Sequence, residues 1–473
     1  MPWVPRWYSF LATFLIVAVC SSGAIVSVDG GRASANVQRD GARLVLYNQT
    51  FRFSGANIYW LGLDENVPPG TIAVPTPFRV DDALTTAVGM GARAVRSHTL
   101  GVSCGFAYSF EPTLGEFHAD ALRMADYAVA RAEALGLKLV IPLTDNYHYF
   151  HGGKHCFTDW IGVPEEDFYT NAAVIDAFEA YIRALLTHVN PYTGRPYHDT
   201  NAILAWETGN ELLPTPGSNW TARIAAFIKS VDAQHLVLSG TYGVSLEELP
   251  YPEIDIHSMH FYPPNTVTLQ AGMALCAAFN KTYLAGEIGW TYNASDTVPS
   301  LESFLSSAVE GTASGTLYWS LFPHADDEGF VPHNDGFTLH YPGDWPFMAN
   351  RTVLLATHAT QMKGEGPWTP STPATRPQLH RPQHCATTPE HRNDTRCSLS
   401  WRGSALARSY SVYGLSAKRG NLPFLVAANV TDDELPVNVS FAAQTDAGNC
   451  FVVVPSGGDD DDLPGPQSEE QCH

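Results

Sequence analysis

The sequence predicts an α/β fold: a (β/α)8 TIM barrel followed by a small C-terminal β-sandwich. From residue 51 to residue 364, eight short strand-like runs alternate with segments of helical length and periodicity. Alternation of this kind is typical of a parallel sheet, and eight strands are the number that closes a barrel. A chain of 473 residues, 45 % of them hydrophobic, is long enough for such a barrel and a second, smaller module.

The eight strand candidates are short apolar runs that end near a polar or turn-forming residue. They span residues 51–60, 93–100, 138–146, 203–211, 235–242, 254–262, 283–290 and 316–322. Helical spacing of apolar residues is clearest in residues 118–135, 171–189 and 345–362. An open doubly wound sheet is the alternative, and it is disfavoured because no GxGxxG motif follows the first strand.

The N-terminus has the features of a secretory signal peptide over residues 1–24. Arg6 precedes an apolar stretch at 10–20 and a run of small residues at 21–24. A signal anchor is the alternative, but this stretch is short for a membrane span. No later segment has 18 uninterrupted apolar residues. We expect a secreted, extracellular protein that does not associate with the membrane after cleavage. Glycosylation is expected at eight sequons: Asn48, Asn219, Asn280, Asn293, Asn350, Asn393, Asn429 and Asn438.

Seven cysteines remain after the signal peptide, which carries Cys20. An odd number requires at least one free thiol or an intermolecular bond. Cys276 lies in a helix-like apolar segment and is the expected buried thiol. Spacing alone does not determine the disulfides. The favoured pairings are Cys104 with Cys156, Cys385 with Cys397, and Cys450 with Cys472.

The remaining segments suggest how the chain is divided. Residues 25–364 are expected to form the barrel, with an N-terminal hairpin over about 25–50 that could plug its bottom. Residues 365–384 are rich in Pro and Thr, as in a linker. Residues 385–473 hold short alternating runs, as in a small β-sandwich, and an acidic stretch at 459–462 that is expected to be a solvated turn or tail.

The chain is acidic, with a net charge of −21 and a pI near 5.2. Nucleic acid is therefore an unexpected partner, because its phosphates require a basic face. A neutral polysaccharide or oligosaccharide would be indifferent to this charge. We expect a soluble monomer.

Polar residues end most of the predicted strands, and the carboxyl ends of barrel strands meet at one rim. Two of them are glutamates, Glu211 and Glu287. Cleaving a glycosidic bond takes one protonated carboxyl to donate to the leaving oxygen and one ionised carboxylate to attack or shield the anomeric centre. Arg96, His260 and Tyr262 are available to support the ionised one.

The polar residues also resemble a known family. Arg96, Asn210-Glu211, His260-X-Tyr262, Glu287 and Trp319 stand on strands two, four, six, seven and eight in the order found in glycoside hydrolase family 5, the cellulase and mannanase family. Trp206-Glu207-Thr208-Gly209-Asn210-Glu211 is similar to the Trp-Glu-X-X-Asn-Glu of the mannanase branch, and Asp145-Asn146-Tyr147 to its Asn-Asn-Trp stretch. The tail resembles a fibronectin type III module around residues 399–413.

The resemblance implies a retaining mechanism with the two carboxyls about 5–5.5 Å apart. It makes Glu211 the general acid/base and Glu287 the nucleophile. The implied substrate-binding residues are Arg96, Asn146, Asn210, His260, Tyr262 and Trp319. Within this set, Asn210 would bind the sugar 2-hydroxyl and Trp319 would lie under the sugar ring.

The function implied is that of a secreted β-glycosidase acting on a β-1,4-linked polysaccharide. The favoured substrate is mannan, cleaved within the chain as by an endo-β-1,4-mannanase. An exo-β-mannosidase, a transglycosylase and a β-1,4-glucanase are the alternatives on the same scaffold, and a non-catalytic carbohydrate-binding barrel is the alternative from another class. Asp145 and Tyr147 depart from the family pattern, which affects expectations about substrate preference. No cofactor or metal is expected, because His148, His151 and His155 are interpreted as a polar and aromatic wall of the sugar site.

Overall fold

The structure of the protein, a computed structural model, describes residues 35–473 with short gaps. The gaps are 68, 102–103, 105–107, 374, 381–382, 388–393, 416–422, 443–449, 458–466, 470 and 473. The predicted signal peptide and the acidic stretch at 459–462 lie outside the described residues. In the part of the chain that is described, no helix is both long and apolar enough to cross a membrane.

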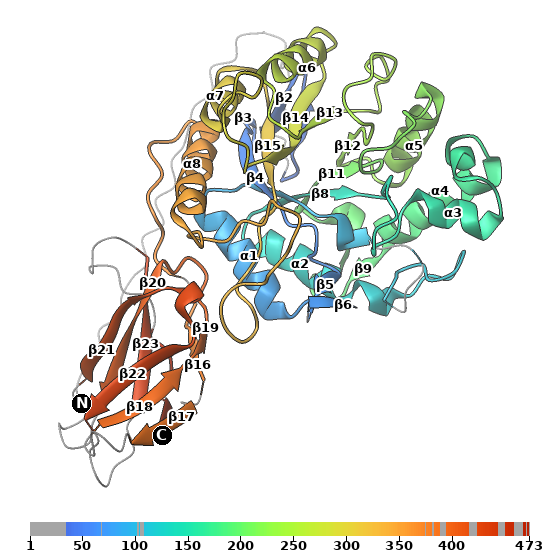
Figure 1. Ribbon diagram of the computed structural model, residues 1–473. Coiled ribbons are helices and arrows are strands. Elements are labelled where there is room, and N and C mark those ends of the chain that lie inside the picture. The colour runs from blue at the N-terminus through green and yellow to red at the C-terminus, as the bar shows by residue number, and fades with distance from the viewer. Residues whose placement is uncertain are drawn as a thin grey trace, which may run out of the picture. The chain divides into compact units, whose positions relative to one another are not determined.

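Eight parallel strands close into a barrel, as the sequence predicts (Figure 1). Each strand overlaps the range predicted for it, and each pairs in parallel with both neighbours. In chain order they are β4 (Phe53–Asn57), β7 (Ala94–Arg96), β8 (Lys138–Pro142), β11 (Ile203–Glu207), β12 (Leu236–Leu238), β13 (Ile256–Phe261), β14 (Thr282–Gly289) and β15 (Gly315–Trp319).

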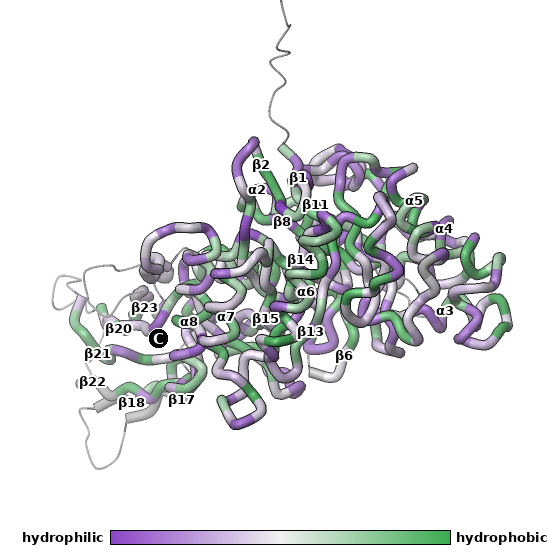
Figure 2. Tube along the Cα trace, turned by 90° about the horizontal axis from the view of Figure 1, so that it is seen from above, coloured by the Kyte–Doolittle hydropathy of each residue, from purple (hydrophilic) through white to green (hydrophobic). Residues whose placement is uncertain are grey.

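Helices connect and surround these strands. They are α1 (Pro77–Gly89), α2 (Arg123–Ala134), α3 (Lys154–Ile161), α4 (Ala172–Thr187), α5 (Ser218–Val231), α6 (Thr266–Ala278), α7 (Leu301–Glu310) and α8 (Pro346–Lys363). Local signals start them: Thr76 and Asn171 cap α1 and α4 with side-chain oxygens, and α1 and α8 begin with proline. The traces of α4 and α5 alternate between hydrophobic and hydrophilic residues, as expected of helices with one buried face (Figure 2).

A small antiparallel sheet covers the end of the barrel at which its strands begin. It consists of β1 (Gln38–Asp40), β2 (Arg43–Leu46) and β3 (Gln49–Thr50). Leu44 and Phe51 are buried in the same cluster as Val140 and Leu204 of the barrel strands. The amino-terminal end of the barrel is thus filled with apolar side chains, which leaves the opposite end for a polar site.

The C-terminal segment forms a separate set of antiparallel sheets. Their strands are β16 (Gln378–Leu379), β17 (Gln383–Thr387), β18 (Asp394–Leu399), β19 (Trp401–Arg402), β20 (Ser409–Leu415), β21 (Pro423–Val430), β22 (Val437–Ala442), β23 (Cys450–Ser456) and β24 (Gln471–Cys472). Trp401 and Tyr410 pack edge to face at 5.2 Å in the core of this module.

A buried histidine joins this module to the barrel. His324 contacts Asp82 of α1 at 3.0 Å and Asp432 of the module at 3.3 Å. Although burial favours the neutral ring, the two carboxylates raise the pKa of His324 to about 10. The imidazole is therefore charged at neutral pH and forms an ion pair with each side of the junction.

The cysteines follow the predictions where they are described. Cys104 and Cys156 form a disulfide, and Cys276 is a buried free thiol. Cys397 and Cys450 are each disulfide-bonded, and the backbone of Cys450 pairs in register with that of Cys472. The side chains of Cys385 and Cys472 lie outside the described residues, so these two pairings stay predictions.

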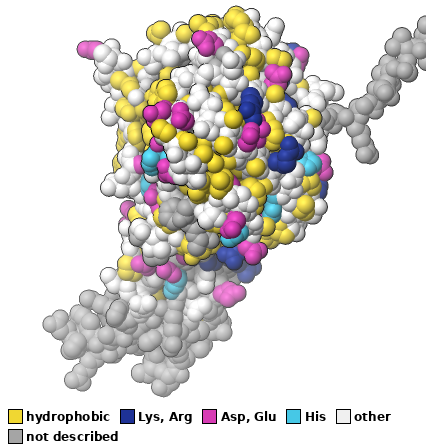
Figure 3. Space-filling view, turned by 90° about the vertical axis from the view of Figure 1, so that its right-hand side faces the viewer, with side chains coloured by type: hydrophobic (Ala, Val, Ile, Leu, Met, Phe, Trp, Pro, Cys, Tyr) yellow, Lys and Arg dark blue, Asp and Glu magenta, His cyan; other side chains and the backbone are white. Residues whose placement is uncertain are grey.

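The surface agrees with the acidic composition. On the face in Figure 3, basic side chains are scattered among acidic and hydrophobic ones, and the described part of this face carries no broad basic patch. The described sequon asparagines are all exposed, namely Asn48, Asn219, Asn280, Asn293, Asn350, Asn429 and Asn438. Asn393 lies outside the described residues.

Candidate active site

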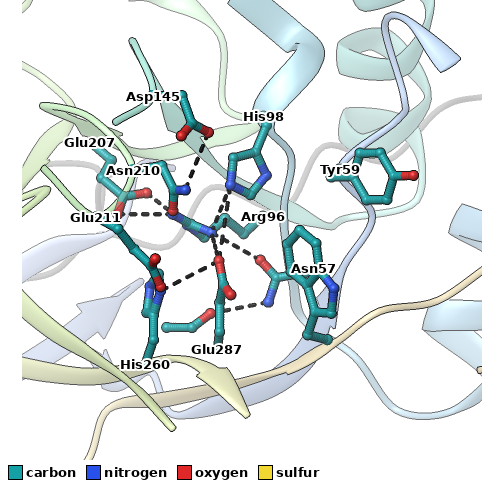
Figure 4. Close-up of polar contacts among 12 residues, drawn as sticks. Asn57, Tyr59, Arg96, His98, Asp145, Glu207, Asn210, Glu211, His260 and Glu287 are labelled. Carbon is teal, nitrogen blue, oxygen red and sulfur yellow. Dashed lines mark hydrogen bonds and ion pairs between the residues drawn. The ribbon is translucent and has the colours of Figure 1, made fainter. Parts of the chain in front are cut away.

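Polar side chains at the carboxyl ends of the barrel strands surround one cavity of about 630 Å³. Arg96 ends β7, Glu207 ends β11, His260 is near the end of β13, and Glu287 is near the end of β14. These side chains converge on one another (Figure 4). The cavity is lined by Tyr59, Glu65, His98, Asp145, Tyr147, His148, Tyr149, Phe150, His151, Asn210, Glu211, Tyr242, Tyr262, Glu287, Tyr292, Trp319, His333, Asp335 and Phe337.

Arg96 organises the base of the site. Its Nε and Nη2 donate to the two oxygens of Glu207 at 2.7 and 3.1 Å. Its Nη1 donates to Glu287 at 2.7 Å and to Asn57 at 3.2 Å, and its Nη2 also donates to Asn210 at 2.8 Å. Only a guanidinium presents donors in a planar fork that can hold two carboxylates and two amides at once. Arg96 therefore fixes the position of Glu287 relative to Asn210.

Glu287 is 5 % exposed and accepts a hydrogen bond on each oxygen. Oε1 accepts from Arg96, and Oε2 accepts from the Tyr262 hydroxyl at 2.7 Å. Burial raises the pKa of Glu287 and the nearby charge of Glu211 adds to this, whereas His260 and Arg96 oppose the rise. The two donors favour the carboxylate form, and burial keeps water away from it. A desolvated carboxylate held in one orientation is suited to nucleophilic attack.

Glu211 occupies a different kind of position. The predicted strand at 203–211 ends at Glu207, and Glu211 lies in the following loop with a φ of 50°. A non-glycine residue rarely adopts this left-handed conformation, which costs about 1–3 kcal/mol and is concentrated at functional sites. Tyr147 donates to one oxygen at 2.9 Å, and Nδ1 of His260 is 2.5 Å from the other.

Glu211 and His260 form a close pair whose members shift each other's pKa. Burial works to raise the pKa of Glu211, but the hydrogen bond and charge of His260 outweigh it and lower the pKa. For His260 burial works to lower the pKa, but the charge of Glu287 and the hydrogen bond to Glu211 raise it. The two opposite shifts belong to the pair, because each group favours the charged form of the other. An oxygen of Glu211 lies within 4.8 Å of an oxygen of Glu287.

Aromatic rings form the wall beside Glu287. Trp319 stacks on Tyr59 with ring centroids 5.5 Å apart and an interplanar angle of 11°, and its edge meets His98. The Trp319 indole donates to Asp335 at 2.7 Å. A fixed indole beside the carboxylates offers a flat apolar surface to a sugar ring.

The structure brings all but one of the predicted site residues into this network. Asn210, Tyr262, Trp319 and the two glutamates line the cavity. Arg96 and His260 are buried beneath the glutamates, where they contact carboxylates instead of forming the wall.

Asn146 is the exception. Its side-chain oxygen accepts from Lys154 at 2.7 Å and from the backbone NH of Leu213 at 2.8 Å, and it is not among the residues that line the cavity. Its neighbours Asp145 and Tyr147 line the cavity instead. The Asn146 oxygen is thus bonded within the protein, and substrate binding by this residue stays a prediction.

Most of the residues that line the cavity are absent from the predicted set, and three residues of the site show why. Asn57 ends β4 and accepts from Arg96, Tyr242 follows β12, and His98 follows β7. The rule that polar residues end barrel strands would have found Asn57 and Tyr242 if it had been applied to the first and fifth strands. His98 lies two residues after Arg96, and the structure places its ring beside Trp319.

The histidine cluster forms part of the cavity wall. His148 and His151 line the cavity, and His151 contacts Asp145 at 3.1 Å. His155 stacks on His148 at 3.8 Å. It also lies beside the Cys104–Cys156 disulfide, whose sulfurs are already bonded to each other.

The chain belongs to the family described as glycoside hydrolase family 5 β-mannosidase-like, whose family model matches residues 34–291. It is 29 % identical over 266 residues to mannan endo-1,4-β-mannosidase 1 of Arabidopsis thaliana, covering 50 % of this chain and 62 % of that protein. It is 28 % identical over 375 residues to mannan endo-1,4-β-mannosidase 2 of Oryza sativa subsp. japonica, covering 66 % and 81 %. The chain thus spans less than two thirds of the Arabidopsis relative.

The fold is that of solved family 5 structures. The endo-1,4-β-mannanase of Rhizomucor miehei aligns with a TM-score of 0.58 and 22 % identity, over 70 % of this chain and 100 % of that one. The family 5 mannosidase of the same organism aligns with a TM-score of 0.54 and 16 % identity, over 69 % and 99 %. At these identities the likeness establishes the barrel alone.

Proposed function

We propose that the protein is a retaining β-glycosidase that hydrolyses β-1,4-linked mannan or manno-oligosaccharides. The observation that carries this proposal is the pair Glu211 and Glu287, whose carboxylate oxygens approach within 4.8 Å. Retaining enzymes hold their carboxyls about 5–5.5 Å apart, whereas inverting enzymes keep about 6.5–9.5 Å to admit a water. The short separation therefore favours direct attack by one carboxylate.

In the first step, an oxygen of Glu287 attacks the anomeric carbon and the bond from that carbon to the leaving oxygen breaks. The proton held by Glu211 and His260 moves through Glu211 to the leaving oxygen. The products are a glycosyl ester on Glu287 and a free alcohol. Because the ester removes the charge of Glu287, the Glu211–His260 pair then holds a proton less tightly and can act as a base.

In the second step, a water attacks the anomeric carbon as Glu211 accepts its proton. The ester bond breaks and Glu287 returns to its carboxylate form. Two displacements on opposite faces restore the original configuration. Asn210 lies between Arg96 and Asp145 and faces the cavity, which supports a hydrogen bond to the sugar hydroxyl beside the reacting carbon.

Mannan is proposed from the relatives. The curated relatives above are named mannan endo-1,4-β-mannosidases, and the family model is described as β-mannosidase-like. A β-1,4-glucanase would use the same carboxylates, so a direct comparison of mannan with glucan is needed to test the sugar. Attack on the same glycosyl ester by a sugar hydroxyl in place of water would transfer the sugar instead of hydrolysing the bond.

Secretion is part of the proposal. The Cys104–Cys156 disulfide and the exposed sequon asparagines suit an oxidising, glycosylating compartment. We also propose that the protein acts as a monomer, and that the C-terminal sheets are a fibronectin type III-like module.

The test is hydrolysis of a panel of β-1,4-linked mannan, glucan and xylan, with the first-formed anomer followed by NMR. We expect activity on mannan and a β-anomer as the first product. An α-anomer would overturn the retaining mechanism, and preference for glucan would overturn the substrate assignment. Oligosaccharides longer than the starting material would indicate transfer.

A further inference from the structure

The position of the acid separates the two sides of the cavity. In the proposed mechanism Glu211 protonates the leaving oxygen, so the leaving group lies on its side. That side carries Tyr147, which donates to Glu211, and Tyr149, which packs against Tyr147 at 5.4 Å. In the same mechanism the sugar bonded to Glu287 lies on the other side, where Trp319 lines the cavity.

The side that holds the sugar bonded to Glu287 is called the glycone side. Two loops from distant parts of the chain meet at its far end. Glu65 lies in β5 (Asp64–Asn66), which pairs with β6 (Pro69–Ala73) soon after the first barrel strand. His333 lies in the loop after the last barrel strand. Both residues line the cavity, and Nδ1 of His333 is 4.0 Å from Glu65.

Further contacts make this junction continuous with the sugar platform. The Tyr59 hydroxyl donates to Glu65 at 3.0 Å and is 3.4 Å from His333. The His333 ring is also 3.5 Å from Asp335, which holds the indole of Trp319. The wall therefore runs without a break from Trp319 to Glu65.

A buried ion-pair network ties the bases of the two loops together. Arg79 donates to Asp64 at 3.1 Å and to the backbone oxygen of Asn66 at 2.7 Å, both in the first loop. It also donates to Asp326 of the last loop at 2.7 Å. Because Arg79 is 6 % exposed and pairs with a carboxylate from each loop, separating the loops would break one of its two ion pairs.

Exposure differs sharply between the two ends. On the leaving-group side Tyr149 is 53 % exposed and Tyr242 is 49 % exposed. On the glycone side Tyr59 is 5 % exposed, and the side chains of His333 and Glu65 are 15 % and 39 % exposed. The cavity thus opens toward the leaving group and is walled beyond the platform. Its volume of about 630 Å³ is that of a compact ligand site, for which about 300–1,000 Å³ is usual.

We propose that the Glu65–His333 junction is an end wall that admits one sugar on the glycone side, so the enzyme removes single mannosyl residues from non-reducing chain ends. This inference rests on the proposed function and refines it. It departs from the endo-acting cleavage that the sequence resemblance implies. The wall excludes a second glycone sugar, whereas the exposed tyrosines accept leaving chains of any length.

The test is digestion of β-1,4-mannohexaose labelled at its reducing end, with early products identified by mass. We expect free mannose and labelled chains that shorten by one residue at a time. Mannobiose or mannotriose from the unlabelled end among the first products would overturn the end wall while leaving the glycosidase function intact. No cleavage of any β-mannoside would instead overturn the proposed function, and the end wall with it.

Two substitutions test the wall itself. Glu65→Ala with His333→Ala shortens both sides of the junction without touching Glu211 or Glu287. We expect the ratio of mannobiose to mannose to rise at least about tenfold, the range that sterically determined subsite selectivity covers. Glu166→Ala, an exposed glutamate outside the cavity, is the matched control and should keep the wild-type ratio. An unchanged ratio in a double variant that melts at the wild-type temperature would contradict the proposal.

Discussion

The two glutamates of the site stand on differently built parts of the barrel. Glu287 lies within a buried strand, and its carboxylate is held by Arg96 and Tyr262. Glu211 lies in a loop with a left-handed backbone, and its carboxylate is 2.5 Å from Nδ1 of His260. In the proposed mechanism, the first carboxylate carries a fixed negative charge and the second carries the transferable proton. The difference matches the two roles that glycoside cleavage requires.

The largest expected effect comes from removing the fixed charge. Glu287→Ala should lower kcat/KM on manno-oligosaccharides by at least about ten-thousandfold, roughly 5 kcal/mol, because no covalent intermediate can form. The rate is measured alongside the melting temperature. Arg96 keeps both hydrogen bonds to Glu207, so the fold should persist. Near-wild-type turnover would remove Glu287 from the role of nucleophile.

Removing the proton carrier should give a smaller, substrate-dependent loss. Glu211→Ala should slow hydrolysis of mannan by about 10²- to 10⁴-fold, the usual contribution of a general acid. On an aryl mannoside with an acidic leaving group, formation of the glycosyl ester should survive, because that group needs no proton. Added azide, which attacks without a base, should then restore turnover as a glycosyl azide. Full activity of Glu211→Gln on mannan would refute the assignment.

A matched pair of tyrosines separates the two sides more finely. Each donates one hydrogen bond to one glutamate, Tyr262 to Glu287 and Tyr147 to Glu211. Losing a hydrogen bond to a charged group costs about 1.5–3 kcal/mol, or about ten- to a hundredfold in rate. Tyr262→Phe should slow cleavage of every substrate, whereas Tyr147→Phe should slow only those with poor leaving groups. Equal rate losses in the two variants, on substrates with good and with poor leaving groups alike, would contradict the different roles of the two glutamates.

The smallest expected effect is a change in pH dependence. The acidic limb of kcat/KM reports protonation of Glu287, whose pKa burial raises. The basic limb reports loss of the proton held by Glu211 and His260, and Glu287 and Glu211 raise the pKa of His260. In His260→Asn only Glu211 can hold that proton, so the basic limb should move to lower pH. A basic limb that stays in place would place the essential proton elsewhere.

The fold was largely predictable from local pattern. A strand buried on both faces gives an uninterrupted apolar run such as Leu204–Ala205–Trp206, and each such run is a strand in the structure. The same reasoning extended β11 four residues too far, to Glu211. Positive φ at Glu211 is a tertiary outcome, because the loop is held by Asn210 bonding to Thr144 and Leu212 bonding to Gly240.

The site was predictable in its residue types but not in its contacts. Strand-end position identified Arg96, His260 and Glu287, because every strand end of a parallel barrel reaches one rim. Strand-end position did not show that Arg96 donates two hydrogen bonds to Glu207, or that Asn146 accepts one from Lys154. Those outcomes depend on side-chain direction at the rim.

The sequence by itself determined the order of strands and helices and the two glutamates near the ends of their strands, because burial periodicity and local signals act over a few residues. Only the tertiary structure decided that Arg96 bridges Glu207 and Glu287, residues 111 and 191 positions away. It also decided that Glu65 and His333, which both line the cavity, lie 4.0 Å apart. Barrel closure places the first and last strands side by side, and a contact of that kind leaves no trace in local sequence.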